Sequence, residues 1–351
     1  MTSADGTGDP LRAVLRELAA GRPAQPVAVT HAFDVVMRGE ATPVQIAALL
    51  MGLRVQGESA AVIAAVARAL RGVMVRLPTD APDTLVDTCG TGGGAISTFN
   101  ISTAAALVAA GAGARIAKHG NRSFTSRSGS ADVLEALGVR ADPSVPEMQH
   151  ALAAAGIAFM YAPRMHPAMR HVGPVRRELA VPTVMNVVGP LANPAMAGRQ
   201  VVGVADAHRA PLIAGALADL GAVHALVVHG EPGLDEVSPL GPTHVYEIVA
   251  PDPGAPREVR EWTIHPEALG LRVSDASELA GGEPAENARV VLDVLGGGGT
   301  AGARAAVLLN AGAAVYVAGL APTYEAAVER ARAALDGGLG LRTLERLRAA
   351  Y

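Results

Sequence analysis

The sequence Asp87-Thr-Cys-Gly-Thr-Gly-Gly-Gly-Ala95 holds a glycine turn (90–95) between a short β-type run, Leu85–Val86, and an alanine-rich helix former, 104–110. The order strand, glycine turn and helix is a typical local unit of an α/β fold. Glycines let backbone N–H groups approach an anion closely, and the N-terminus of the next helix adds a favourable dipole. The turn therefore predicts a cradle for a phosphorylated ligand.

Two flanking segments add oxygen donors and positive charge. The hydroxyl segment is Ser97-Thr-Phe-Asn-Ile-Ser-Thr103, and the cationic loop is Lys118-His-Gly-Asn-Arg122. Lys118 and Arg122 would pair with phosphate, and Ser102 or Thr103 could offer an oxygen to a hydrated Mg²⁺. Together with the turn, these segments favour a diphosphate as the ligand.

Three other interpretations of the glycines compete with a phosphate cradle. Glycine runs often serve only as tight turns. A dinucleotide site needs the helix directly after the glycines and an acidic residue about 20 positions on, whereas here Ser97–Asn100 intervenes and the next strand candidate ends in Lys118. A nucleotide-triphosphate P-loop fails because no Gly-Lys-Ser/Thr follows the turn.

Composition limits the remaining classes. The chain has 351 residues, which fits two domains, and its 40 glycines and 24 prolines suit many short α/β units. The net charge of −4 gives no general attraction to nucleic acid or to anionic membranes. The single cysteine, Cys89, excludes internal disulfides, and we interpret it as a small packing residue. The opening residues lack a signal-peptide pattern, so we expect a cytoplasmic protein.

The pattern along the chain predicts two domains. Residues 11–77 are helical by pattern; Thr42-Pro43-x-Gln45 is a capping box and Ser59 caps the next helix. We expect an N-terminal helical domain at 1–78 and an α/β domain at 84–351. In the second domain we expect a mostly parallel central sheet flanked by helices. Its strand candidates are Leu85–Val86, Ala114–Ala117, Ile157–Tyr161, Val201–Val204 and Ala225–Val228.

A series of motifs in order along nearly the whole chain resembles anthranilate phosphoribosyltransferase. Besides the glycine turn, the hydroxyl segment and the cationic loop, they include Ser128-Gly-Ser-Ala-Asp-Val-Leu-Glu-Ala-Leu-Gly138, His166-Pro-Ala-Met-Arg170, Val175-Arg-Arg-Glu-Leu179, Asn186-Val-Val-Gly-Pro-Leu191 and Gly230-Glu-Pro-Gly-Leu-Asp-Glu-Val-Ser-Pro239. The chain departs from this pattern at Gly94, where the family usually has an aspartate. It departs again at Pro182 and Met185, which replace an arginine and a phenylalanine.

The resemblance implies the nucleoside phosphorylase/phosphoribosyltransferase class of fold, with an N-terminal helical domain that part of about 165–191 joins, an interdomain site and a homodimer. It implies transfer of the 5-phosphoribosyl group from 5-phosphoribosyl 1-pyrophosphate to anthranilate in tryptophan biosynthesis. The matched positions for the phosphoribosyl donor are Gly90, Thr91, Gly92, Gly93, Gly94, Thr98, Asn100, Ile101, Ser102, Thr103, Lys118, His119, Gly120, Asn121, Arg122, Ser123, Phe124, Thr125, Ser126 and Ser130.

The resemblance also implies an acceptor site and a metal site. Gly90, Asn121 and Arg176 would contact anthranilate, with Arg176 on its carboxylate. Ser102, Asp235 and Glu236 would hold Mg²⁺, which we expect as two ions. No side chain is assigned proton transfer; Asn121, Arg176 and Lys118 would position the reactants.

Two rival functions remain at this point. A pyrimidine nucleoside phosphorylase shares the fold and a related phosphate site, but it would leave Arg176 without a carboxylate partner. A non-catalytic relative that binds nucleic acid should show a basic surface and degraded metal motifs, whereas this chain is acidic and keeps Asp235-Glu236.

Overall fold

The computed structural model describes residues 9–123, 127–250 and 255–351. The chain divides into two compact units. The helical unit is Met1–Val75 with His166–Ala192, and the α/β unit is Arg76–Met165 with Asn193–Tyr351. Within the described ranges, no helix is long and apolar enough to cross a membrane.

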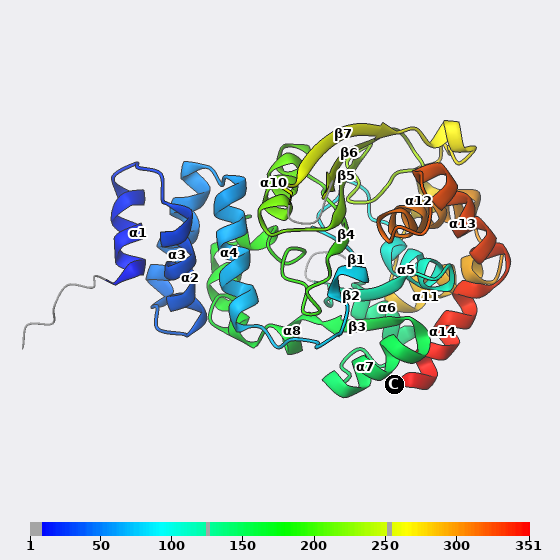
Figure 1. The fold of residues 1–351 in the computed structure, drawn as a ribbon, viewed down its shortest axis with the longest axis horizontal. Coiled ribbons are helices and arrows are strands. Elements are labelled where there is room, and N and C mark those ends of the chain that lie inside the picture. The colour runs from blue at the N-terminus through cyan, green and yellow to red at the C-terminus, as the bar shows by residue number, and fades with distance from the viewer. Residues whose placement is uncertain (1–8, 124–126, 251–254) are drawn as a thin grey trace, which may run out of the picture. The chain divides into compact units, whose positions relative to one another are not determined.

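Four helices and a returning segment build the helical unit (Figure 1). α2 packs against α1 and α4, and α3 packs against α1 and α9. The predicted capping box is present: Thr42 Oγ1 accepts the N–H of Gln45 at 3.3 Å, and Gln45 Oε1 accepts the N–H of Thr42 at 2.9 Å. Ser59 caps α4 by accepting the N–H of Val62 at 3.3 Å. The elements are α1 Pro10–Ala19, α2 Pro26–Met37, α3 Pro43–Gln56, α4 Ala60–Val73, α9 Gly173–Leu179 and the short turns η2 Pro167–Arg170 and η3 Val184–Asn186.

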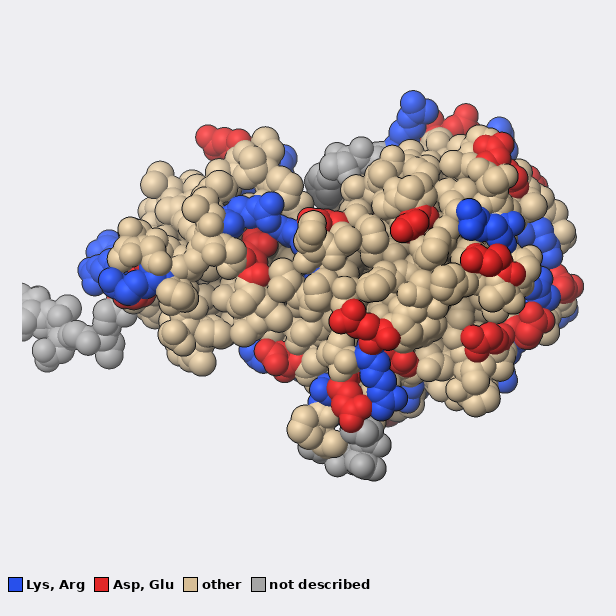
Figure 2. Space-filling model, turned by 90° about the horizontal axis from the view of Figure 1, so that it is seen from above, with Lys and Arg blue, Asp and Glu red and all other residues tan. Residues whose placement is uncertain are grey.

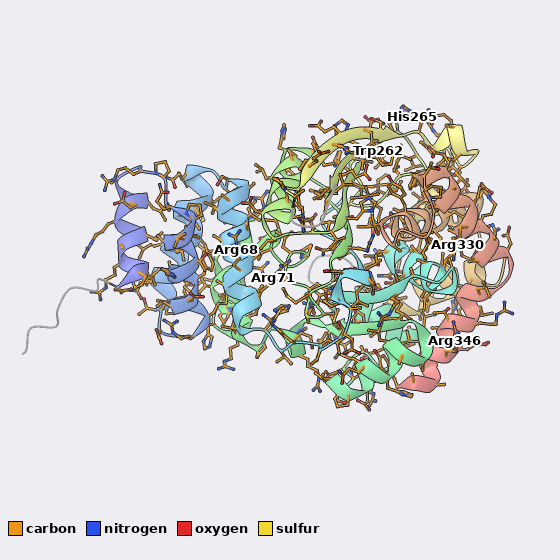
Figure 3. The ribbon with its side chains drawn as sticks, in the orientation of Figure 1. Arg68, Arg71, Trp262, His265, Arg330 and Arg346 are labelled. Carbon is orange, nitrogen blue, oxygen red and sulfur yellow. The ribbon has the colours of Figure 1, made fainter. Side chains whose placement is uncertain are left out.

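A side chain of α4 fixes the end of the returning segment. The Arg71 guanidinium (Figure 3) donates from Nε to the carbonyl of Leu191 at 2.7 Å. Such a bond to a charged donor satisfies a carbonyl that lies outside regular structure. The segment is thereby part of the helical unit, although 90 or more positions separate it from α4 in the chain.

A seven-stranded sheet forms the centre of the α/β unit, in the order β3-β2-β1-β4-β5-β6-β7. The first five strands pair in parallel, and β6 and β7 add to β5 as antiparallel strands. The mostly parallel sheet with flanking helices confirms the predicted fold class. The strands are β1 Leu85–Gly90, β2 Arg115–Gly120, β3 Ile157–Tyr161, β4 Arg199–Gly203, β5 His224–Gly230, β6 Thr243–Val249 and β7 Glu258–Ile264.

The strand order changes direction between β1 and β4. From β1 the chain continues to β2 and β3 on one side, and β4 and β5 lie on the other. In open parallel sheets, ligands bind beyond the carboxyl ends of strands at such a switch point. The glycine turn leaves the sheet there, because Gly90 at the end of β1 pairs with Gly203 at the end of β4.

Small apolar side chains fill the core of this unit. The helices α5, α12, α13 and α14 lie together on one side of the sheet, and α10 covers the other side (Figure 1). Alanine, valine and leucine dominate the packing, as the scarcity of aromatic residues requires. The remaining elements are α5 Ile101–Gly111, α6 Ser130–Ala136, α7 Val145–Ala155, α8 Ala162–Met165, α10 Ala210–Asp219, α11 Pro284–Leu295, α12 Ala301–Val317, α13 Tyr324–Asp336, α14 Leu339–Ala350 and the short turns η1 Pro82–Thr84, η4 Ala207–Arg209, η5 Pro266–Leu269 and η6 Ala276–Leu279.

One buried carboxylate ties the antiparallel strands to α12. Glu247 on β6 accepts hydrogen bonds from His224 Nε2 at 2.8 Å, Trp262 Nε1 at 2.9 Å and the Tyr316 hydroxyl at 2.9 Å. Trp262 lies on β7, as Figure 3 shows. Three donors on separate elements compensate the burial of the carboxylate, and together they outweigh its desolvation and lower its pKa.

Candidate functional site

The glycine turn follows β1 as predicted, and its backbone needs glycine. Gly92 and Gly93 have φ of 72° and 82°, in the left-handed region that side chains disfavour. The turn is anchored to the next strand, because the N–H of Thr91 donates to the carbonyl of Gly203 at 2.9 Å. α5 begins at Ile101, so the hydroxyl segment separates the turn from the helix. This spacing differs from the dinucleotide-binding pattern, as the sequence indicates.

The carboxylate loop (231–238), which follows β5, lies directly against the glycine turn. Asp235 Oδ2 accepts the N–H of Gly92 at 2.8 Å, and the carbonyl of Gly233 accepts the N–H of Ala95 at 2.9 Å. Glu236 Oε1 accepts the N–H of Ser102, in the first turn of α5, at 3.1 Å. Two motifs from distant parts of the sequence therefore meet at the switch point of the sheet.

The two neighbouring carboxyl groups are held in an environment that disfavours their charge. Burial raises the pKa of Asp235, and the hydrogen bond from Gly92 only partly opposes this shift. For Glu236, burial and then the nearby Asp235 raise the pKa to about 8, against the opposing effect of Lys118. Carboxyl groups with raised pKa values beside a glycine turn are typical of functional sites, because a cation would relieve their unfavourable charge.

Lys118 is buried within the sheet. The sequence places it after a strand ending at Ala117, but β2 continues to Gly120 because its pairing with β3 extends to Tyr161. Its ammonium donates to the carbonyl of Thr88 at 2.5 Å and to Ser102 Oγ at 3.2 Å. Burial lowers the pKa of Lys118, and Asp87 opposes that shift. The ammonium thus lies beside the hydroxyl that is predicted to bind metal.

The neighbours of Lys118 are also buried. The backbone N–H of His119 donates to Asp87 Oδ1 at 3.0 Å, which joins β2 to β1 by a side chain. Gly120 permits close packing, because an added Cβ would lie 2.1 Å from Ser130 Oγ. Ile101 and Thr103, both predicted to contact the donor, are 1% exposed. Their side chains therefore belong to the core of the unit in this structure.

Arg122 is exposed and has acidic partners within the protein. Its guanidinium donates to Asp132 at 2.9 Å and to both carboxylate oxygens of Glu135 at 2.7 Å. These contacts raise its pKa, Glu135 contributing most. Nearby, the hydroxyl of Ser130 donates to the carbonyl of Asn121 at 3.3 Å. The predicted contacts Phe124, Thr125 and Ser126 lie outside the described residues.

Asn100 is the centre of a polar network that the sequence analysis missed. Its Oδ1 accepts from Ser128 Oγ at 3.1 Å and from Asn287 Nδ2 at 2.9 Å, and its Nδ2 donates to the carbonyl of Ser128 at 3.1 Å. Asn287 belongs to α11 and is 2% exposed. The hydroxyl segment and the loop before α6 are therefore linked through one amide. A lone asparagine in an otherwise periodic helix is the only sequence signal for Asn287.

Arg176 belongs to the helical unit, on α9. It is partly buried, whereas its neighbour Arg177 is exposed. Burial lowers the pKa of Arg176, and no described side chain pairs with its guanidinium. A desolvated guanidinium of this kind is suited to a bidentate contact with a planar carboxylate.

The acidic residues and hydroxyl at the turn fit a hard divalent cation. Asp235, Glu236 and Ser102 offer oxygen atoms, which Mg²⁺ prefers, and burial, which raises the pKa of both carboxyl groups, makes their negative charge unfavourable without a bound cation. Among the described residues, no group of three or more His, Cys, Asp or Glu side chains could form a metal site alone. Such a site suits Mg²⁺, which keeps waters and binds substrate phosphates alongside one or two carboxylates.

Comparisons with known proteins agree with this arrangement. Residues 82–341 match the a/b domain of a glycosyl transferase family, and residues 12–74 match the helical bundle domain of the same family. The anthranilate phosphoribosyltransferase of Rubrobacter xylanophilus is 49% identical over 336 residues, which cover 96% of each chain. That of Thermomicrobium roseum is 48% identical over 335 residues, which cover 95% of each chain.

Solved structures give the same result. The anthranilate phosphoribosyltransferase of Thermus thermophilus has a TM-score of 0.89 at 40% identity, covering 96% of this chain and 98% of that one. The Saccharomyces cerevisiae enzyme, in complex with PRPP and Mg, has a TM-score of 0.87 at 27% identity over 98% of both chains. The chain belongs to the glycosyl transferase family that these matches define, among its anthranilate phosphoribosyltransferases.

Proposed function

We infer that the protein transfers the 5-phosphoribosyl group from 5-phosphoribosyl 1-pyrophosphate to anthranilate, with release of pyrophosphate, in tryptophan biosynthesis. Besides the family match, one observation of the site supports this inference. Two hydrogen bonds join the carboxylate loop to the glycine turn and to α5, from Gly92 to Asp235 and from Ser102 to Glu236. These contacts bring anion-binding and cation-binding groups together, as a metal-bound diphosphate requires.

The difficult step is breakage of the bond between ribose C1 and the pyrophosphate oxygen. The ribose then develops oxocarbenium character while the leaving group gathers negative charge. Preorganised donors near that charge stabilise the transition state more than the bound substrate. We assign this role to backbone N–H groups of the glycine turn and to Lys118. The ammonium of Lys118 is held in place by Thr88 and Ser102 before any substrate binds.

We propose that Ser102 and Glu236 hold one Mg²⁺ and that Asp235 with Glu236 holds a second. When bound, Mg²⁺ would neutralise the diphosphate and the charge that develops on it. The raised pKa of Glu236 supports this assignment, because burial and the nearby Asp235 make its negative charge unfavourable and a bound cation would offset that effect. The other donor contacts remain as the resemblance implies, including Thr98 and Asn100 on the hydroxyl segment.

We propose that Arg176 binds the carboxylate of anthranilate and that Gly90 and Asn121 complete the acceptor site. The partly buried guanidinium on α9 supports this choice over the exposed Arg177. The aniline nitrogen of anthranilate is unprotonated near neutral pH, so the reaction needs no strong base. Holding the nitrogen next to C1 supplies the required rate by positioning.

We propose that two copies of the chain associate through the helical unit and that the protein acts in the cytoplasm. Val27, Val44 and Val55 on α2 and α3 are 69%, 77% and 81% exposed, which supports a partner on those helices. Acidic and basic side chains intermix on the described surface of the face in Figure 2, which gives no support to nucleic-acid binding. Sedimentation of the purified protein tests the dimer.

The activity is tested by following the fluorescence of anthranilate with the phosphoribosyl donor and Mg²⁺. We expect consumption that depends on all three components, and none with folded protein would overturn the inference. Phosphorolysis of a pyrimidine nucleoside, measured in parallel, should be absent. For the metal site, Glu236→Gln should lower kcat and weaken the Mg²⁺ dependence, because a neutral amide is a poor ligand for a hard cation. Glu231→Gln, an exposed change in the same loop, is the matched control.

A further inference from the structure

α12 carries one buried amide in an otherwise apolar surface. The helix is built from alanine, glycine, valine and leucine apart from Arg304, Asn310 and Tyr316. Asn310 lies at its middle and is 3% exposed. An amide buried in such surroundings destabilises a protein unless its donors and acceptor are all matched.

The matching partner of Asn310 is the backbone of a single residue in the carboxylate loop. Asn310 Oδ1 accepts the N–H of Val237 at 2.9 Å, and Asn310 Nδ2 donates to the carbonyl of Val237 at 2.9 Å. The second hydrogen of Nδ2 bonds the carbonyl of Ala306 at 2.9 Å, which fixes the orientation of the amide on its own helix. The side chain thus pairs with Val237 as a neighbouring strand would.

Val237 directly follows Glu236, so this pairing sets the direction in which the Glu236 side chain leaves the loop. The rest of the loop is held from its two ends. The N–H of Leu234 bonds the carbonyl of Gly230 at 2.6 Å, and the N–H of Ser238 bonds Thr243 Oγ1 at 2.9 Å. Between these ends the loop is fixed by Asp235, which accepts the N–H of Gly92, and by Asn310, which lies next to the carboxylate that accepts from Ser102.

A small cavity shows how closely these groups pack. Its volume is about 10 Å³, and Ser102, Glu236 and Asn310 are among the residues that line it. This space is about the minimum for one water molecule. The Glu236 side chain therefore has little room to reorient towards α12 while Asn310 holds the loop.

We propose that Asn310 is a positioning residue, which holds the carboxylate loop so that Glu236 faces the metal site. The proposal rests on the proposed role of Glu236 in binding Mg²⁺. Mutation of a residue that orients a metal ligand without binding the metal itself typically changes metal affinity by about 10- to 100-fold. We therefore expect Asn310→Ala to raise the Mg²⁺ concentration for half-maximal rate on the order of tenfold.

The test compares Asn310→Ala with Tyr324→Phe. The Tyr324 hydroxyl donates to the carbonyl of Leu309, so the control also removes one buried hydrogen bond to α12, without touching the loop. Hydrogen–deuterium exchange is measured on the metal-free proteins, and Mg²⁺ titrations of the initial rate follow. We expect faster exchange across 231–240 and a higher Mg²⁺ requirement only in Asn310→Ala. The KM for anthranilate should stay within about twofold of the wild-type value. A general disruption of the active site would instead change the KM values of both substrates.

Three results would overturn the proposal. These are an unchanged Mg²⁺ requirement in folded Asn310→Ala, an equal change in Tyr324→Phe, and unchanged exchange in the loop. If Asn310→Ala does not fold, Asn310→Asp keeps the volume and the acceptor for Val237 but removes the donor, and the same outcomes apply. Glu236→Gln separates the two proposals: if it leaves Mg²⁺ dependence unchanged, the metal site itself fails, whereas a change in Glu236→Gln alone refutes only the role of Asn310.

Discussion

The carboxylate of Asp235 accepts the backbone N–H of Gly92 at 2.8 Å, although 143 positions separate the two residues. The bond uses one of the backbone donors that the glycine turn would otherwise present to phosphate. It also keeps an acidic residue beside the turn in a chain that lacks the usual aspartate at position 94. The effect of placing an acidic residue at position 94 should therefore depend on the nearby carboxylate of Asp235.

We predict that Gly94→Asp changes the Mg²⁺ optimum and the KM for the phosphoribosyl donor, with little effect on the KM for anthranilate. An added Cβ would lie 3.3 Å from the carbonyl of Gly233 and 3.4 Å from Asp235 Oδ1, so the substitution is tight but needs no left-handed backbone. A new carboxylate there would attract metal and repel phosphate. Mg²⁺ titrations of both proteins, with melting curves, check this. Superimposable titrations from equally stable proteins would show that position 94 faces away from the metal.

Arg176→Ala should mainly raise the KM for anthranilate, because it removes a contact made before and during the reaction. Loss of a charge-assisted pair typically costs about 2–3 kcal/mol. Steady-state kinetics with varied anthranilate measure the effect. Arg177→Ala is the control, since Arg177 is exposed on the same helix. A larger effect of Arg177→Ala would show that the wrong arginine is assigned.

The raised pKa of Glu236 predicts how the stability of the metal-free protein depends on pH. A carboxyl group whose pKa rises on folding, here to about 8, contributes stability below its unfolded pKa and loses it as pH rises towards 8. We expect this group to lower the Tm of the metal-free protein between about pH 5 and 8, and Glu236→Gln to flatten this fall. Calorimetry in EDTA is the measurement. Parallel curves of Tm against pH for wild type and Glu236→Gln would contradict the burial of the Glu236 charge.

Glu247→Gln should destabilise the α/β unit by about 1–3 kcal/mol, because three donors lose a charged acceptor. The pKa of Glu247 is lowered, so its contribution is present above the unfolded pKa near 4.5 and is lost as pH falls below it. Urea unfolding at neutral and acidic pH measures the difference between wild type and variant. The difference in unfolding free energy between wild type and Glu247→Gln should be smaller at acidic pH. Glu258→Gln, an exposed change on the neighbouring strand, should have little effect.

Local patterns located the N-terminal helices and the parallel strands, although not every end of those strands. Ile157–Tyr161 is the strand that the sequence predicts, and Ser59 caps its helix. The antiparallel strands β6 and β7 were not predicted. β7 is an exposed edge strand rich in charge, so burial imposes no alternation on most of it. It pairs with β6 along its length, and its Trp262 donates to Glu247; no local pattern encodes these contacts.

The candidate site shows the same limit. Motifs located the glycine turn and Asp235-Glu236, but no local signal indicated that Lys118 would lie inside a strand. Asn287 and Asn310 were missed because each acts on a loop far away in sequence. A buried asparagine in an apolar helix is a recognisable signal once its partner is known. The partner itself follows only from the tertiary packing.

Gly203, at the end of β4, lies so close to the carboxylate loop that an added Cβ would be 1.6 Å from the carbonyl of Asp235. The packing of the loop against the strand end therefore requires glycine at position 203. A loop grafted from this chain into a relative would be excluded by any side chain at position 203, however well its own residues matched. Recombination between relatives should thus succeed at breakpoints that keep β4 and the carboxylate loop from the same parent.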